Sequence, residues 1–256
     1  MIPSQFTRYI HFINDKTRIV DADTIVETPV SLTVNGENWL TFMCTPILLD
    51  ELGIGFLFNE GIISDVLELA DIRICEHGDN LDIWLNHSVE KPAKWRRTSG
   101  CSGGVTGVEL LSGDLPVVPF QGAILTPLQI NNLIIRLFEI QKLYKETGGV
   151  HTSALSDGDK IIISAEDIGR HNTLDKIAGA YLRIKPTLAH KILITTGRIS
   201  SEMLQKASRL EAEVLISRTS PSSLSIELAE KTGITLIGYA RRDRFNVYAH
   251  PERIAA

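Results

Sequence analysis

The stretch at residues 192–217, ILITTGRISSEMLQKASRLEAEVLIS, decides the fold. It opens with an apolar run over 192–196 that contains a threonine pair and leads into Gly197. A helical pattern over 200–211 follows, and a second apolar run over 214–217 completes the stretch. Strand, polar turn, helix and strand in this order are typical of an α/β domain, in which helices cover a sheet.

The same alternation continues on both sides of this stretch. Further strands are expected over 151–156, 161–165, 234–239 and 245–248, and further helices over 172–182 and 223–232. Thr126 and Pro127 have the residue types of an N-cap and a first helical position, and Gly148-Gly149 suits a helix end. They predict one helix from 126 to about 147. We therefore expect a mostly parallel sheet covered by helices in residues 126–256.

Residues 1–125 predict a smaller, strand-rich part. Apolar runs flank Asn35-Gly36 and Gly78-Asp79-Asn80, and these turn residues tolerate the positive φ that tight hairpins require. A helix is expected over 48–58. Residues 86–126 follow no clear period. The fold class is thus α/β, with a strand-rich N-terminal part at 1–125 and an α/β domain at 126–256 whose strand ends bind a nucleotide or cofactor.

Composition limits the classes of function. The 256 residues are 43% hydrophobic and 22% charged, which fits a globular chain and excludes disorder. A net charge of -5 provides no overall basic field for duplex nucleic acid. No segment reaches the roughly 20 apolar residues of a membrane helix. The N-terminus has no secretory signal pattern. We expect a cytoplasmic protein without nucleic-acid or membrane partners.

The three cysteines have different surroundings. They are too few and too far apart for a disulfide scaffold, so they suit a reducing compartment. Cys75 lies in a strand pattern and Cys44 lies just before a helix, and both are interpreted as packing residues. Cys101 lies in TSGCSGG at 98–104, near Arg96 and Arg97. Because nearby cations lower the pKa of a thiol, Cys101 is the candidate nucleophile. The alternative is an incidental cysteine in a structural loop.

Polar turns follow several expected strands. They are Gly169-Arg170-His171, Gly197-Arg198 and Arg218-Thr219-Ser220, each just before a helix. Helix N-termini attract anions, and ligands of open α/β sheets collect at the carboxyl ends of strands. An anion pocket is therefore predicted there, with Arg198 and Ser220 lining its phosphate region. The alternative is ordinary helix capping.

The segment RRDRFNVYAH at 241–250 places three arginines before an aromatic-amide-aromatic strand. Planar cations and rings suit a nucleotide, whereas a charged edge strand is the alternative. A metal site is not expected, because the seven histidines and three cysteines form neither a CxxC nor an HxxxH spacing.

Taken together, these segments resemble the FdhD family, the sulfur carrier proteins required for formate dehydrogenase activity. The matching stretches are TSGCSGG at 98–104, GVHTS at 149–153, EDIGRHNTLDK at 166–176, TGRISSEMLQK at 196–206, SRTSP at 217–221 and RFNVY at 244–248. They appear in family order and span about two-thirds of the chain.

The resemblance implies a cytoplasmic, homodimeric sulfurtransferase with a cytidine-deaminase-like layered α/β fold. Family members accept a persulfide from a cysteine desulfurase on a loop cysteine, which maps onto Cys101. They pass the sulfur to Mo-bis(molybdopterin guanine dinucleotide) before this cofactor enters formate dehydrogenase, and a guanine nucleotide is expected to mimic it. The cofactor-contacting segment maps onto Phe245, Asn246, Val247, Tyr248, Ala249 and His250.

One departure from the family leaves two alternatives. Many members carry CxxC in the loop, but the second position here is Gly104, so Cys101 acts without a neighbouring thiol. A molybdenum-cofactor chaperone without sulfur transfer is therefore one alternative. A deaminase-fold zinc hydrolase is the other, although His151-Thr152-Ser153 lacks the required glutamate and no PCxxC follows.

Overall fold

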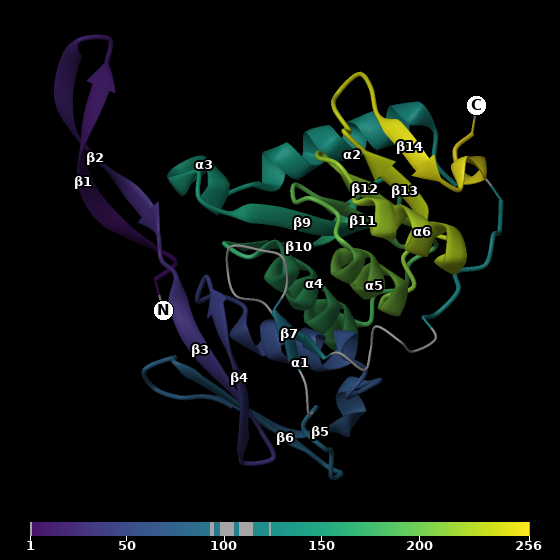
Figure 1. Ribbon diagram of the computed structural model, residues 1–256, viewed down its shortest axis with the longest axis horizontal. Helices are drawn as coiled ribbons and strands as arrows, with labels where there is room; N and C mark the ends of the chain where they lie inside the picture. Colours follow the sequence, from purple (N-terminus) through teal and green to yellow (C-terminus); the bar gives the residue numbers. More distant parts are fainter. Residues whose placement is uncertain (1, 93–94, 98–104, 108–114, 123, 256) are drawn as a thin grey trace.

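A computed structural model describes residues 2–92, 95–97, 105–107, 115–122 and 124–255. A layered α/β body, a smaller N-terminal sheet and a projecting two-stranded arm make up the described chain (Figure 1). Within the described residues, no helix has both the length and the apolar composition needed to cross a membrane.

A six-stranded sheet forms the centre of the body. Its strands are β9 (His151–Ser156), β10 (Ile161–Asp167), β11 (Ile192–Thr195), β12 (Val214–Ser217), β13 (Thr235–Gly238) and β14 (Asn246–Ala249). They lie in the order β10-β9-β11-β12-β13-β14. All six strands expected from the sequence are present, with ends that differ by one or two residues.

The sheet is mixed, so the prediction of a mostly parallel sheet is wrong. Within the described residues of this sheet, β11–β12 and β12–β13 are the parallel pairs, whereas β9 pairs antiparallel with both β10 and β11, and β14 pairs antiparallel with β13. The reason lies in the connections. Residues 157–160 and 239–245 are too few for the crossover of a dozen or more residues that parallel pairing requires.

Helices cover both faces of this sheet. On one face, α2 (Pro127–Ile140) buries Ile130 and Leu133 against Ile192 and Ile194 of β11. The opposite face is covered by α4 (Arg170–Ile184), α5 (Ser201–Arg209) and α6 (Ser223–Thr232), which pack around Leu193. Because the central strands are buried on both faces, they are continuously apolar. The α/β class is confirmed, and the cytidine-deaminase-like layering stays a prediction.

The helix expected from 126 to 147 is two helices. Thr126 caps α2 as predicted, but the helix ends at Ile140, and α3 (Leu143–Thr147) follows. The Glu166 carboxylate on β10 accepts hydrogen bonds from the backbone N–H groups of Lys142, Leu143 and Tyr144, at 2.9 to 3.0 Å. This tertiary cap starts α3 independently of α2, and nothing in the local sequence indicates it.

The N-terminal sheet consists of β3 (Thr28–Val34), β4 (Glu37–Cys44), β5 (Leu69–Ile74) and β6 (Asn80–Leu85). Their order is β4-β3-β6-β5, and both predicted hairpins are present. Asn35 and Gly36 have φ of 49° and 82°, as a type I′ turn demands. Helix α1 (Leu49–Asn59) packs on this sheet, and the short helix η1 (Val66–Glu68) leads into β5.

Two glycines let α1 lie directly against α4, which joins the two parts. A Cβ on Gly55 would come within 1.7 Å of the Asp175 carbonyl oxygen, and one on Gly179 within 2.0 Å of the Glu51 carbonyl oxygen. Backbone approach this close is possible only without side chains. The N-terminal sheet is therefore fixed to the α/β body through its helix.

The division at residue 125 stays a prediction. Residues 115–122 and 124–125 lie along the C-terminal body, because Val118 and Leu125 belong to the two apolar clusters that flank its sheet. Leu125 forms a bridge with Ile254, just after the short helix η3 (Pro251–Arg253).

A long hairpin at the N-terminus has no counterpart among the predicted elements. Strands β1 (Ser4–Ile13) and β2 (Lys16–Ile25) pair over their whole length and project away from the body (Figure 1). Near the base, Ile25 packs against Gly149. Phe6, Ile10, Phe12 and Ile19 are more than 60% exposed. Neither face of this hairpin is buried, so its strands lack the regular alternation of apolar and polar residues that predicts a strand.

Candidate functional site

The polar turns meet at one edge of the central sheet. Since β9 runs antiparallel to both β10 and β11, strands β10 to β13 all point the same way. Their carboxyl ends share one edge, where β9 and β14 begin. Helices α4, α5 and α6 start there as well, so their free N–H groups lie along this edge.

A first cavity of about 260 Å³ lies between two of these turns. Arg198 and Ser220 both line it, together with Arg170, and their binding of phosphate stays a prediction. The two turns are held side by side because Ile199 N–H donates to the Ser220 oxygen, and Ser222 N–H donates to the Ile199 oxygen. Two arginines and two helix starts therefore face one small space, an arrangement suited to a phosphate.

Gly197 sets the position of Arg170. A Cβ on Gly197 would lie 2.9 Å from the Cβ of Arg170, so the arginine packs directly on the turn. The turn is closed by Thr195, whose hydroxyl oxygen accepts from the Gly197 N–H at 3.1 Å.

The buried His171 pairs with the partly buried Glu202 next to this cavity. The His171 Nε2 lies 3.6 Å from the Glu202 carboxylate and 3.3 Å from the Ser200 hydroxyl. Burial lowers the pKa of His171, which favours the neutral imidazole. The hydrogen bond from His171 lowers the pKa of Glu202 to about 2. A neutral donor and a charged acceptor thus orient the start of α5.

A second cavity of about 360 Å³ lies on the other side of the Thr196 turn. It is lined by His151 and Thr196, whose Nδ1 and hydroxyl oxygen are 3.3 Å apart. Burial, and next the charge of Arg170, lower the pKa of His151. The side chain is therefore a neutral donor or acceptor at the edge of the sheet.

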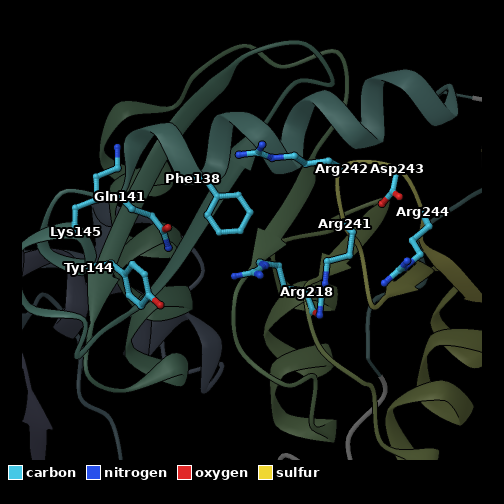
Figure 2. Close-up of a pocket in the computed structure, with 9 residues that line it drawn as sticks. All are labelled: Phe138, Gln141, Tyr144, Lys145, Arg218, Arg241, Arg242, Asp243 and Arg244. Carbon is cyan, nitrogen blue, oxygen red and sulfur yellow. The ribbon is translucent and has the colours of Figure 1, made fainter. Parts of the chain in front are cut away.

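A third cavity of about 610 Å³ continues from the second and shares Gln141, Tyr144 and Arg218 with it. Figure 2 shows Phe138 of α2, Tyr144 of α3 and Arg218 after β12 around this space. The Arg218 guanidinium carbon lies 4.2 Å from the centre of the Phe138 ring. Burial and the neighbouring Arg241 lower the pKa of Arg218. The cavity is thus cationic and partly aromatic.

The structure spreads the predicted segment 245–250 over the sheet instead of gathering it at one point. Asn246 begins β14 at the site edge, and its amide lies 3.4 Å from the Tyr248 hydroxyl. Phe245 and Val247 pack with the apolar cluster under α2, whereas Ala249 is buried. His250 lies beyond the far end of β14, where its ring contacts Glu252 and Glu230. The Tyr248 ring packs against Gly238, the last residue of β13.

Cys101 lies outside the described residues. The short strands β7 (Trp95–Arg97) and β8 (Val105–Gly107) pair antiparallel on either side of residues 98–104. Cys44 is buried, and burial raises the pKa of its thiol to about 12, so it packs as expected. Cys75 is partly buried, and its thiol lies 2.9 Å from the Asp79 carboxylate.

Sequence reasoning missed Phe138, Gln141, Tyr144 and Lys145 of the third cavity. Phe138 is an apolar residue of the kind expected in a core. Tyr144 lies in the segment that was predicted as one continuous helix. The break at Gln141-Lys142 is what brings Tyr144 to the edge, and only Glu166 on a distant strand signals it. Among the described residues, no three His, Cys, Asp or Glu side chains gather as ligands for a metal ion.

Fold and site together define a layered α/β protein with a cationic groove along the carboxyl edge of its sheet. Comparison with known proteins narrows this class. The model of the FdhD/NarQ family matches residues 25–255, and the chain belongs to this family.

Individual relatives agree with this assignment. The sulfur carrier protein FdhD of Staphylococcus aureus (strain bovine RF122 / ET3-1) is 37% identical over 234 residues, which is 90% of this chain and 88% of the relative. The same protein of strain Newman has equal identity and coverage. A crystal structure described as a formate dehydrogenase accessory protein from Desulfotalea psychrophila has a TM-score of 0.82 and 28% identity. It covers 99% of this chain and 100% of its own.

Proposed function

We propose that this protein is a sulfur carrier that accepts sulfur on Cys101 and delivers it to the molybdenum cofactor used by formate dehydrogenase. Membership of the FdhD/NarQ family, whose relatives include sulfur carrier proteins, supports the class of activity. The donor is a cysteine desulfurase, and the acceptor is Mo-bis(molybdopterin guanine dinucleotide). In this proposal the protein is a cytoplasmic homodimer and acts as a sulfurtransferase.

The first transfer conserves atoms and electrons. The Cys101 thiolate attacks the outer sulfur of the desulfurase persulfide, a new S–S bond forms, and the desulfurase cysteine leaves as a thiolate. Cys101 then holds a persulfide. In the second transfer the acceptor bonds to the outer sulfur and supplies the electron pair, while the Cys101 sulfur leaves as a thiolate.

The groove at the sheet edge is the proposed binding site for the acceptor. Arg170, Arg198 and Arg218 follow β10, β11 and β12, whose carboxyl ends share one edge of the sheet, and α4, α5 and α6 start at the same edge. This row of cations at helix starts is the single observation that carries the assignment, because the proposed acceptor bears phosphate groups at its nucleotide ends. Asn246 and Tyr248 lie at the same edge and would contact the base.

The decisive experiment is intact-mass measurement after incubation with a cysteine desulfurase and cysteine. We expect a mass increase of about 32 Da, one sulfur atom, which thiol reductants remove. Cys101→Ala should abolish this increase, and the matched variant Cys75→Ala should retain it. An adduct that persists in Cys101→Ala would overturn the assignment of the carrier thiol.

A cofactor chaperone without sulfur transfer is the second candidate, and Gly104 in place of a second loop cysteine favours it. The same measurement separates the two functions. A native protein that binds guanine nucleotide but never gains sulfur would be a chaperone.

A further inference from the structure

The second cavity, of about 360 Å³, differs in charge from its two neighbours along the site edge. Several cations line the cavities on either side, whereas Arg218 is the one formally charged side chain among the described residues that line the second. The rest of this lining is uncharged and includes an aromatic ring, two apolar side chains and a glycine turn, namely Tyr144, Val150, Ile168 and Gly148-Gly149. Such walls suit a flat, uncharged ring better than a phosphate.

Thr196 determines which nitrogen of the His151 ring carries the proton. The Thr196 hydroxyl oxygen accepts a hydrogen bond from the Thr152 N–H at 3.0 Å, and it lies 3.3 Å from His151 Nδ1. Within the described part of the chain, Nδ1 is the acceptor that the hydroxyl proton reaches. A hydroxyl has a single proton to donate, so this proton goes to Nδ1. A neutral imidazole that accepts at Nδ1 carries its own proton on Nε2.

The His151 ring therefore offers an N–H donor to the second cavity. Its hydrogen bond to the described residues is made at Nδ1, and the residue lines the cavity, where Nε2–H is left for a ligand. Burial lowers the pKa of His151, the charges of Arg170 and Arg198 lower it further, and Asp167 opposes them. The ring is thus neutral at ordinary pH, and its tautomer depends on Thr196.

We propose that Thr196 is a positioning residue that fixes His151 as a donor, and that this donor reads an oxo group on a flat, fused heterocycle in the second cavity. An oxo oxygen accepts from Nε2–H, whereas an amino group at the same place brings a second donor and is rejected. The inference deepens the proposed function and rests on it for the choice of ring. The proposed acceptor contains pterin and guanine rings, and both carry a ring oxo group.

Nitrogen-15 NMR of the His151 imidazole in the full chain tests the tautomer, with His151→Gln identifying the resonances. At about pH 7.5 the native ring should carry its proton on Nε2 and none on Nδ1. Thr196→Ser keeps the hydroxyl and should keep this tautomer. Thr196→Val removes the hydroxyl at nearly the same volume and should populate both tautomers. A native ring that is protonated at Nδ1 would overturn the proposal.

Adding ligands to the same sample tests the reading of the oxo group and identifies its source. A shift of the Nε2 resonance by GDP assigns the cavity to a guanine ring, and a shift by neopterin alone assigns it to a pterin ring. ADP, whose ring carries an amino group instead, should leave the resonance in place. A shift by neither oxo ring, or an equal shift by ADP, would overturn the assignment.

Calorimetric titration then measures what the hydroxyl contributes. The ring that shifts Nε2 should bind Thr196→Val about 3- to 10-fold more weakly than Thr196→Ser, roughly the effect of one neutral hydrogen bond. His190→Gln removes an imidazole at the opposite edge of the sheet, before β11, and should leave this affinity unchanged. Equal binding by the two Thr196 variants would refute the positioning role. Neither measurement requires sulfur, so the Cys101 mass increase tests the proposed function separately.

Discussion

At the scale of single residues, Asp167 shows that much of the family-like segment at 166–176 is structural. Its carboxylate accepts hydrogen bonds from the Gly169 and Thr45 N–H groups, the Asn172 amide and the Lys176 ammonium. The Lys176–Asp167 pair is fully buried at 2.5 Å. Thr45 follows β4, so this network joins the end of the N-terminal sheet to the start of α4.

Removing one partner of the Lys176–Asp167 pair should strongly destabilise the folded protein. Asp167→Ala leaves the Lys176 ammonium buried without a countercharge, and we expect the free energy of unfolding to fall by about 3–5 kcal/mol. Urea denaturation measures the change. Asp21→Ala, which breaks the exposed pair with Arg8 on the arm, should leave stability nearly unchanged. Equal effects of the two substitutions would contradict this role of Asp167.

The His171–Glu202 pair predicts a pH dependence. The folded pKa of His171 lies below its ordinary 6.5, so the unfolded chain binds the extra proton first as the pH falls. This contribution to stability is complete above about pH 6.5 and is lost as the pH falls toward the folded pKa. Glu202 contributes in the same direction, but only as the pH falls from about 4.5 toward 2.

His171→Asn should therefore flatten the decline in unfolding free energy between about pH 7 and pH 5, as measured by denaturant titrations at several pH values. The control is Leu204→Ala, which destabilises the core without removing a titratable group. It should lower stability at every pH and keep the slope. An unchanged slope in His171→Asn would show that this imidazole is not the titrating group.

At the scale of elements, the contact between α1 and α4 depends on the absence of side chains at Gly55 and Gly179. Gly179→Ala places a methyl group within 2.0 Å of the Glu51 carbonyl oxygen, so the helices must separate. We expect a loss at the upper end of the about 1–3 kcal/mol typical of overpacking, measured by thermal and urea unfolding. Glu227→Ala on exposed α6 should cost little, and an equally small effect of Gly179→Ala would refute the close contact.

Elements with strong local signals were predictable, and elements set by distant partners were not. Asn35-Gly36 specifies its hairpin through its own φ preferences, and Thr126-Pro127 specifies the start of α2. The end of α2 depends on Glu166, which lies more than twenty residues away. The arm at Ser4–Ile25 lacks a buried face, so hydrophobic alternation gives little warning of it.

At the scale of the whole molecule, charge is distributed unevenly. The chain carries a net charge of -5, yet arginines concentrate at the carboxyl edge of the central sheet. The topology of the sheet produces this concentration, because β10, β11 and β12 are each followed by an arginine at the same edge. The sequence indicated where those turns lie, and Arg198 and Ser220 line one cavity, but phosphate binding there stays a prediction. It could not indicate that 245–250 runs away from that edge, since this depends on the antiparallel pairing of β14.

This local field should make nucleotide binding depend on salt. Raising the ionic strength from about 0.05 M to about 0.3 M screens the arginines, so the affinity for GDP should fall several-fold in calorimetric titrations. Guanosine, which has no phosphate, serves as the matched ligand and should show little change. An affinity for GDP that is independent of salt would argue against phosphate recognition by this edge.

The glycine contact between α1 and α4 can form only after both helices have been synthesised. Gly55 leaves the ribosome more than a hundred residues before its partner Gly179. Synthesis proceeds at roughly 5–20 residues per second, so α1 lacks its partner α4 for about 6 to 25 seconds. The Thr45 N–H also waits for its acceptor, because the Asp167 carboxylate is synthesised more than a hundred residues later. The N-terminal sheet is thus synthesised first, and its attachment to the α/β body is completed last.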